Sequence, residues 1–274
     1  MRMVVKVAGA LLERDEDVRV LARQIAELAR AGHELLVVHG GGKICSNTLA
    51  RMGIGSRFVN GLRITDRETR DAAVMVFAGL LNKKLSGAIS LAGQPAVGIS
   101  AADAACFLAE PMQLDDFEAL GFVGYLTEVN VDFLRSLWRE GIVPVASCMG
   151  LGADGELYNI NADHLAAAAA EFIRAERLIF LTDVAGVLDD GKVLRAVRGT
   201  EIEDLIRRNK VSGGMVLKLE AAKRALAGGV AEVRIVGGTQ PRALLAAGGG
   251  IRSPGTRVLP LIRTSPKAAH GAAQ

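Results

Sequence analysis

The sequence predicts an α/β protein with a mainly parallel sheet that helices cover on both faces. Short apolar runs alternate with longer amphipathic segments over most of the 274 residues. Polar or glycine-rich turns directly follow several of the apolar runs, and open parallel sheets bind ligands in the crevice at the carboxyl ends of their strands. Half of the residues are hydrophobic, which is sufficient for a large buried core.

The first part of the chain repeats a unit of strand, turn and helix. Met3–Ala8 is a continuous apolar run typical of a buried parallel strand, and Glu16–Ala31 carries apolar residues at helical spacing. Glu34–His39 is a second such strand, and three glycines and a helix over 44–52 follow it. Further predicted elements are a hairpin at Asn60–Asp66, a long helix at Asp66–Ala92, a hairpin arm at Phe122–Glu128, a helix at Asp132–Glu140 and a strand at Ile142–Ala146.

The second part continues the alternation. An alanine-rich run at Leu165–Ala175 has high helix propensity, and Arg177–Thr182 is a clear apolar strand. The remaining predicted elements are a hairpin turn at Asp189–Lys192, helices at Glu201–Arg208 and Gly214–Ala227, and a strand at Ala231–Val236. The glycines at 237–238 and 248–250 match no dinucleotide-binding pattern and are interpreted as loops. We expect the tail Arg263–Gln274 to be mobile.

The composition argues against several classes of function. A net charge of +3, with scattered basic residues and only 4% aromatic residues, does not indicate a nucleic-acid surface. No apolar stretch reaches the ~20 residues that cross a bilayer, and the start lacks a signal-peptide pattern, so we expect a cytoplasmic location. Cys45, Cys106 and Cys148 are widely separated and indicate neither a disulfide framework nor a zinc site. Anionic small molecules remain compatible with this charge.

Two lysines and one aspartate are candidates for phosphoryl transfer, which needs cations and backbone donors around the moving group. Lys6 ends the first strand between apolar residues, so we expect it to be buried beside an anionic partner. Lys218 lies near the start of a helix and would approach the moving group from another side. Asp163 is the candidate partner that would keep both lysines charged. The alternatives are exposed surface lysines and an ordinary helix N-cap at Asp163.

The other candidates are a glycine turn and three polar side chains. Gly40–Gly42 would let the backbone approach a ligand closely, and a tight turn between strand and helix is the alternative. The turn lacks the spacing of a Walker A loop. Arg63 would bind a carboxylate with its guanidinium fork or else be exposed, and Asn159 would donate to a substrate carboxylate. Asn161 is equally consistent with a helix N-cap.

A set of ordered motifs carries a resemblance to a known family. In chain order they are Lys6-x-x-Gly9, Val38-His39-Gly40-Gly41-Gly42, Asn60-Gly61-Leu62-Arg63-Ile64-Thr65, Asn82-Lys83, Gly121-Phe122-Val123-Gly124, Tyr158-Asn159-Ile160-Asn161-Ala162-Asp163, Leu181-Thr182-Asp183-Val184-Ala185-Gly186-Val187-Leu188 and Gly213-Gly214-Met215-x-x-Lys218. Over residues 3–258 the chain resembles the amino acid kinase family. The asparagine-rich and Asn-Gly-Leu-Arg motifs are similar to those of the branch that acts on N-acetyl-L-glutamate.

The resemblance implies a three-layer αβα sandwich with an open, mainly parallel central sheet. An amino-terminal lobe, residues 1–176, would bind the amino-acid substrate and mediate dimerisation. A carboxyl-terminal lobe, residues 177–262, would bind the nucleotide. Arginine-inhibited members carry an extra helix before the first strand, and this chain starts with its strand, so we expect an arginine-insensitive homodimer.

The implied activity is ATP-dependent phosphorylation of the side-chain carboxylate of N-acetyl-L-glutamate, the second step of arginine biosynthesis. Lys6 and Lys218 would stabilise the transition state, and Asp163 would organise them. The residues implied at the substrate are Gly41, Gly42, Arg63, Asn159 and Asn161, and those implied at the nucleotide are Gly9, Thr182, Asp183, Val184, Gly186, Val187, Lys210 and Ser212. Mg²⁺ would be held mainly by the nucleotide phosphates, without a protein ligand. A carboxylate with an ordinary pKa of ~4.3 is already ionised at neutral pH, so no general base is needed.

Three segments depart from the family pattern. Ala8 stands where the family has a glycine, which would cost on the order of 1 kcal/mol if the position needs a positive φ. Ser100–Asp103 and Gly237–Arg242 also differ, away from the candidate catalytic residues.

Two other functions stay open. One is a sister kinase that acts on aminoadipate or glutamate carried by a small acidic protein. The other is a non-catalytic sensor that binds an amino acid or a nucleotide, against which intact Lys6, Lys218 and Asp163 argue.

Overall fold

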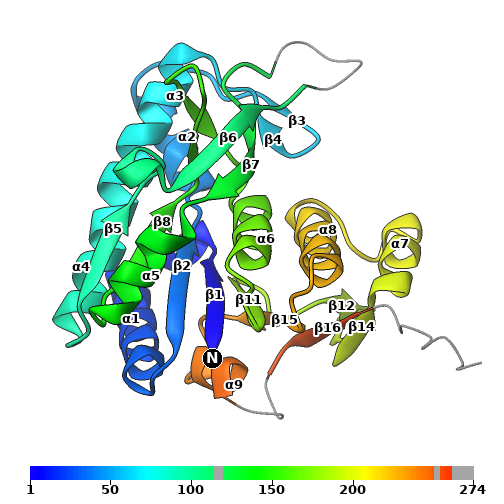
Figure 1. Ribbon diagram of the computed structural model, residues 1–274. Coiled ribbons are helices and arrows are strands. Elements are labelled where there is room, and N and C mark those ends of the chain that lie inside the picture. Colours follow the sequence, from blue (N-terminus) through cyan, green and yellow to red (C-terminus); the bar gives the residue numbers. More distant parts are fainter. Residues whose placement is uncertain (114–119, 250–253, 261–274) are drawn as a thin grey trace, which may run out of the picture.

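The computed structural model describes residues 1–113, 120–249 and 254–260, and Figure 1 shows its helices packed around a central sheet. The sheet has eight strands. Their spatial order is β14 (Ala196–Arg198), β16 (Thr256–Leu259), β15 (Glu232–Gly237), β11 (Arg177–Thr182), β1 (Arg2–Val7), β2 (Glu34–His39), β8 (Val143–Ser147) and β5 (Ala96–Ile99). The strands from β15 to β5 run parallel, and β16 is antiparallel to β15. The predicted fold class is confirmed.

The strand order explains why helices cover both faces. The chain crosses the sheet in one direction from β1 to β2 and later returns from β8 to β11 on the far side of β1. Parallel crossover connections are right-handed, so the two directions place their helices on opposite faces. α1 (Asp15–Arg30) and α4 (Asn82–Leu91) pack together in one layer, and α6 (Ala162–Phe172) and α8 (Gly214–Ala227) pack together in the other. The carboxyl ends of β1, β2, β8 and β11 therefore meet at one edge between the two layers.

The predicted long helix is one continuous helical segment whose winding changes in its middle. α3 (Arg67–Val74) begins after Asp66, whose side chain accepts a hydrogen bond from the Thr69 N–H at 2.8 Å. The π-helical turn η2 (Met75–Leu81) then joins α3 to α4. By length and mean hydropathy alone, the segment from Arg67 to Leu91 could cross a membrane. Half of its most apolar part is buried within the fold, as in the core helix of a globular protein, so this is a weak indication of a membrane span.

Short elements were predicted least well. The hairpins β3 (Phe58–Val59) to β4 (Leu62–Arg63) and β12 (Leu188–Asp189) to β13 (Lys192–Val193) are present as predicted. A second sheet was predicted only as the arm that forms β7; its strands lie in the order β10 (Leu157–Asn159), β9 (Met149–Leu151), β6 (Phe107–Pro111) and β7 (Gly124–Val129). The strands β5, β14 and β16 of the main sheet were also not predicted. Strands of three to five residues are too short to show a clear alternation of apolar and polar positions.

The remaining helices are η1 (Gly9–Leu12), α2 (Gly42–Arg51), η3 (Asp103–Ala105), α5 (Val131–Arg139), α7 (Gly199–Arg207) and α9 (Ala243–Gly249). The interpretation of 248–249 as a loop is wrong, because both glycines end α9. A Cβ at Gly248 would lie 2.7 Å from the Leu28 side chain of α1, so the absence of a side chain lets the two helices pack closely. Gly250 and the tail predicted to be mobile lie outside the described residues. Both predicted lobes contribute strands to the one sheet, and the boundary at residue 176 stays a prediction.

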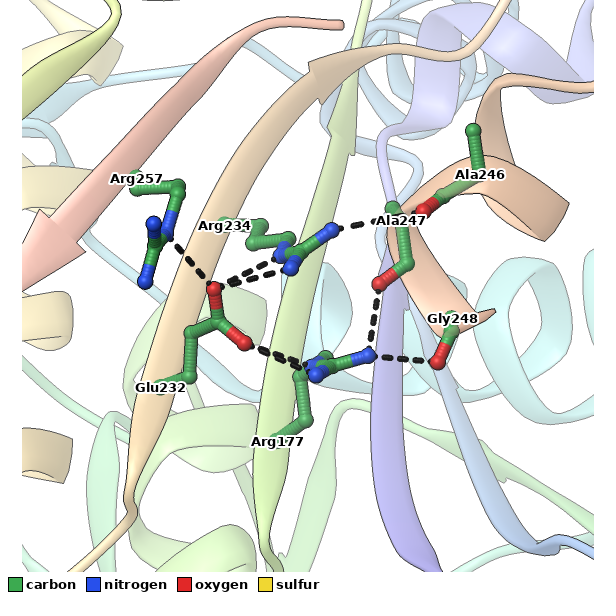
Figure 2. Close-up of polar contacts among 7 residues, drawn as sticks. All are labelled: Arg177, Glu232, Arg234, Ala246, Ala247, Gly248 and Arg257. Atoms are coloured by element: carbon green, nitrogen blue, oxygen red, sulfur yellow. Dashed lines mark hydrogen bonds and ion pairs between the residues drawn. The ribbon is translucent and has the colours of Figure 1, made fainter. Parts of the chain in front are cut away.

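A cluster of arginines around Glu232 joins several elements at the amino ends of the strands, opposite the carboxyl edge (Figure 2). The Glu232 carboxylate accepts hydrogen bonds from Arg177 of β11, Arg234 of β15 and Arg257 of β16. Arg177 and Arg234 also donate to carbonyl groups in the last turn of α9, those of Ala246, Ala247 and Gly248. Burial opposes ionisation of Glu232, but the arginines outweigh it and lower its pKa. One carboxylate thus ties three strands and a helix together.

We expect Glu232→Gln to lower the free energy of unfolding by about 2–3 kcal/mol at pH 7, because it leaves three arginines without their counter-charge. The folded-state pKa lies below the unfolded value of ~4.3, so the stabilisation is present above that pH and is lost as the pH falls through the folded-state pKa. Urea unfolding at pH 7 and pH 3 measures both effects. Glu27→Gln, at an exposed ion pair with Arg242, is the control and should change stability by less than about 0.5 kcal/mol. A difference for Glu232→Gln that is as large at pH 3 as at pH 7 would contradict the assignment.

Candidate functional site

With the exception of Lys218, the predicted catalytic and substrate residues line one cavity at the carboxyl edge of the sheet. Its volume is about 210 Å³. The turns after β1 and β2, the hairpin β3 to β4 and the entry into α6 all contribute to its wall. The predicted residues that line it are Lys6, Gly9, Gly41, Gly42, Arg63, Asn159, Asn161 and Asp163. The predicted catalytic residue Lys218 lies outside this lining, and so do all the positions predicted at the nucleotide except Gly9.

Lys6, Asp163 and Lys218 form a buried ionic triad. The Lys6 Nζ lies 2.8 Å from Asp163 Oδ1, and the Lys218 Nζ lies 3.0 Å from both Asp163 oxygens. All three residues are less than 8% exposed. Burial raises the pKa of Asp163, but the charges of Lys6 and Lys218 outweigh it, and the carboxyl pKa is lowered. Burial and the neighbouring Lys6 lower the pKa of Lys218 to about 8, against the opposing effect of Asp163.

The structure at the start of α6 shows whether Asn161 or Asp163 caps the helix. Asn161 is the N-cap: its Oδ1 accepts hydrogen bonds from the N–H groups of Asp163 and His164 at 2.9 and 3.2 Å. Asp163 therefore does not cap the helix, and its carboxylate is directed to the two lysines instead. The first turn of a helix favours a negative charge, which adds to the stabilisation of the carboxylate. Three unpaired charges at this burial would be unfavourable, whereas the triad leaves one net positive charge beside the cavity.

The two glycine turns are in direct backbone contact. A Cβ at Gly9 would lie 2.7 Å from the Gly41 Cα and 2.9 Å from its nitrogen, closer than side-chain carbons approach backbone atoms. Glycine is required here by the space between the turns. Ala8, the departure from the family pattern, has φ −67° and ψ 143°, which any residue adopts. The alanine therefore causes no backbone strain at that position.

Arg63 is buried rather than exposed. Its guanidinium group stacks on Phe58 and donates hydrogen bonds to Ser56 Oγ, Ser46 Oγ and the Gly42 carbonyl at 2.7–2.9 Å. These contacts hold the β3–β4 hairpin against the start of α2. Asn159 ends β10 and donates from Nδ2 to Thr65 Oγ1 at 3.2 Å. Both side chains line the cavity and are held there by hydrogen bonds to the protein.

Five of the residues predicted at the nucleotide lie at the end of β11 or in the loop that follows it. Thr182 is the last residue of β11, and the loop of Asp183, Val184, Gly186 and Val187 follows it. Asp183 lies near enough to Lys218 to raise its pKa in opposition to burial. Ser212 lies in the turn before α8. The ammonium of Lys210 is engaged in ion pairs with Asp189 and Asp190 of the β12–β13 hairpin.

Sequence reasoning assigned no role to four residues near the cavity. Phe77 and Cys148 line it, and Phe77 belongs to the π-helical turn η2. His39, which ends β2, and Asn82, which follows η2, form a buried contact behind the glycine turn. The available signal was the position of His39 directly before the glycines. Its partner lies 43 residues away, which no local pattern reveals.

Comparison with known proteins shows the family of the chain. A model described as the amino acid kinase family matches residues 1–237. The chain is 49% identical to the acetylglutamate kinase of Koribacter versatilis (strain Ellin345) over 245 residues, which cover 89% of this chain and 93% of that protein. It is 44% identical to the acetylglutamate kinase of Methanopyrus kandleri (strain AV19) over 239 residues, which cover 85% of this chain and 93% of that protein.

Solved structures share the fold. The N-acetylglutamate synthase from Neisseria gonorrhoeae, complexed with coenzyme A and N-acetyl-glutamate, matches with a TM-score of 0.85 and 24% identity. The match covers 94% of this chain and 59% of the synthase chain, so this chain spans about three fifths of that protein. The protein smu.665 from Streptococcus mutans UA159 matches with a TM-score of 0.80 and 25% identity, over 94% of this chain and 98% of that chain.

The backbone geometry of the first turn predicts losses of stability of different size for two neighbouring substitutions. Ala8→Gly should lower the free energy of unfolding by only about 0.4–1 kcal/mol, because it adds freedom to the unfolded chain at a position without strain. Gly9→Ala should lower it by about 1–3 kcal/mol, because the new methyl group must displace the backbone of Gly41. Chemical denaturation of the two variants measures the difference. A Gly9→Ala variant as stable as the unsubstituted protein would show that the turns are not packed against each other.

Proposed function

The chain belongs to the amino acid kinase family, and on this basis we propose that it transfers the γ-phosphoryl group of ATP to the side-chain carboxylate of N-acetyl-L-glutamate. The product would be N-acetyl-L-glutamyl 5-phosphate, formed in the second step of arginine biosynthesis. The observation that carries the proposal is the buried triad of Lys6, Asp163 and Lys218 beside two glycine turns. The names of the curated relatives supply the substrate.

The triad supplies what phosphoryl transfer needs from a protein. An oxygen of the ionised substrate carboxylate forms a bond to the γ-phosphorus, and the bond to the ADP oxygen breaks with its electron pair leaving on ADP. Lys6 and Lys218 approach the moving group from β1 and α8 and stabilise its charge. Asp163 holds both ammonium groups in place and offsets their mutual repulsion. No residue has to remove a proton, because the attacking carboxylate is already ionised.

The amino-acid substrate binds on the β2 side of the triad. Arg63 and Asn159 take its carboxylate and amide groups, and Arg63 exchanges some of its present hydrogen bonds for the substrate. Asn161 keeps its Oδ1 on the helix start, so only its Nδ2 is available to the ligand. Gly41 and Gly42 provide backbone N–H groups next to the transferred group. These donors lie in the wall of the same cavity.

The nucleotide binds on the β11 side of the triad. The loop of Thr182, Asp183, Val184, Gly186 and Val187, together with Gly9 and Ser212, surrounds it. Lys210 has to leave Asp189 and Asp190 in order to contact a phosphate, so nucleotide binding opens these ion pairs. Among residues 1–113, 120–249 and 254–260 no group of three or more His, Cys, Asp or Glu side chains could hold a metal. We assign Mg²⁺ to the oxygens of the nucleotide phosphates, where it neutralises their charge.

The other two candidate functions have less support. The assay below also tests whether the chain is a sister kinase with a carrier-bound substrate or a ligand sensor.

The proposal includes a cytoplasmic homodimer. A mass equal to one chain, 28.8 kDa, measured by light scattering would contradict the dimer.

Turnover should depend on the triad. With Mg-ATP and N-acetyl-L-glutamate, a coupled ADP-release assay with hydroxylamine as acyl-phosphate trap should show hydroxamate formation. Lys218→Ala and Asp163→Asn should each lower kcat by about 100- to 1000-fold. The first removes a cation from the transferred group, and the second removes the counter-charge that holds both ammonium groups in place. Lys223→Ala on the exposed side of α8, where Lys223 pairs with Glu203, is the matched control and should retain activity. Hydroxamate formation from none of acetylglutamate, glutamate or N-acetyl-aminoadipate would favour a carrier-borne substrate or a sensor.

The lowered pKa of Lys218 predicts that kcat/KM falls at alkaline pH. The free enzyme should lose affinity for Mg-ATP above about pH 8, where Lys218 loses its proton, so kcat/KM should fall there. Lys218→Arg keeps a cation at all accessible pH values and should shift this fall to higher pH. If the Lys218→Arg variant turns over too slowly, the affinity of both proteins for Mg-ADP can be compared by calorimetry between pH 7 and 9.5. Identical alkaline limbs in both proteins would exclude Lys218 as the titrating group.

A further inference from the structure

A buried polar contact between His39 and Asn82 lies directly behind the glycine turn. His39 ends β2 and is wholly buried. Its Nδ1 lies 3.2 Å from the carbonyl oxygen of Gly40, and its Nε2 lies 3.2 Å from the Nδ2 of Asn82. The same Asn82 nitrogen donates to the Val145 carbonyl at 2.8 Å. Buried polar groups are costly unless they have partners, and this pair has partners on every side.

The partners determine which ring nitrogen of His39 carries the proton. The amide nitrogen of Asn82 only donates hydrogen bonds, so Nε2 accepts from it and the ring proton is on Nδ1. The Nδ1–H group then donates to the Gly40 carbonyl. Burial lowers the pKa of His39 to about 4, and the charge of Lys6 adds to this against the opposing effect of the Gly40 carbonyl. The ring is therefore neutral, and this tautomer persists, at physiological pH.

The orientation of the Gly40 carbonyl determines that of the next N–H group. Lys6 pairs in register with Val38, so His39 directs its side chain to the opposite face of the sheet, where α4 carries Asn82. The Gly40 carbonyl oxygen points to that face. No cis peptide occurs among the described residues, and in a trans peptide the carbonyl and the following N–H point in opposite directions. The Gly41 N–H is thus directed to the face that holds Lys6.

Two further observations place this N–H at the cavity. Gly41 lines the cavity, and its nitrogen lies 2.9 Å from where a Cβ of Gly9 would be, another residue of the lining. In the described part of the chain, no protein acceptor takes this N–H. The π-helical turn supports the arrangement from behind, because Phe77 and Leu81 pack against Gly41 immediately before Asn82.

We propose that His39 and Asn82 are positioning residues, which aim the Gly41 N–H at the transferring phosphoryl group by holding the Gly40 carbonyl away from it. The inference rests on the proposed function, since it assigns the supports of a donor that acts in that reaction. A preorganised donor contributes to the rate because it needs no reorientation as charge develops on the phosphoryl oxygens.

Three substitutions of His39 separate positioning from packing. An asparagine amide can place its nitrogen near the position of Nδ1 and keep the donor to Gly40, whereas a glutamine amide reaches the position of Nε2. Leucine keeps the volume of the side chain and provides no donor. His39→Leu and His39→Gln should lower kcat by about 10- to 100-fold, with the KM of both substrates within about threefold, and His39→Asn should recover most of the rate.

Ile89→Ala is the matched control for lost stability. Ile89 is buried on α4, away from the turn, so its truncation should destabilise the protein at unchanged kcat. If the rate losses of the His39 variants follow their unfolding midpoints, with His39→Asn no better than His39→Leu, the positioning role is overturned.

The ring tautomer gives a readout that does not depend on turnover. The chain has four histidines, and loss of one signal in His39→Asn identifies the His39 ring in ¹⁵N-histidine spectra. At pH 7 this ring should show a protonated Nδ1 and an unprotonated Nε2. In Asn82→Leu the Nε2–H form should appear, and kcat should fall with it. A protonated Nε2 in the unsubstituted protein overturns the inference. Failure of the proposed function is distinguishable, because it abolishes hydroxamate formation in the unsubstituted protein and leaves the tautomer as stated.

Discussion

The carboxylate of Asp163 is the group on which the geometry of the site depends. It lies within 3.0 Å of two buried ammonium groups that would otherwise repel each other. The three residues come from β1, α6 and α8, so the ion pairs also connect the predicted amino-terminal and carboxyl-terminal lobes. Removal of the carboxylate would leave two buried cations without a partner, a situation that proteins avoid. The same contact therefore stabilises the junction and leaves a single net positive charge for an anionic ligand.

The two ends of the sheet have different chemistry. At the carboxyl ends of the strands, the glycine turns, Lys6, Arg63 and Asn159 line a cavity. At the amino ends, Glu232 satisfies three arginines and fastens α9 to the sheet, with its own pKa lowered by them. The first cluster lines the cavity, and the second makes its contacts within the protein. In the proposed function, one charge cluster thus binds a ligand, whereas the other stabilises the fold.

The sequence predicted the structure best where a local pattern is compatible with only one structural arrangement. A lysine flanked by apolar residues on a strand has to be buried, and Lys6 is. Patterns with two solutions stayed open: Asn161 and Asp163 are both good helix caps, and only the arrival of Lys6 and Lys218 from distant elements separates them. The contact of His39 with Asn82 and the fit of Gly248 against Leu28 depend on helix packing, so no local signal precedes them. The short strands of the second sheet gain their stability from neighbours rather than from their own residues.

The order of the strands has a consequence for the size of molecule that the site selects. β1 lies between β2 and β11. In the proposed function, the turn after β2 contacts the amino-acid substrate and the loop after β11 contacts the nucleotide. Adjacent strands are ~4.8 Å apart, so the two loops are held roughly 10 Å apart by backbone hydrogen bonds alone. Movements of side chains cannot change the distance between these two loops. In the proposed reaction, a ligand anchored at Arg63 has to match that length for its carboxylate to meet the phosphoryl group above β1.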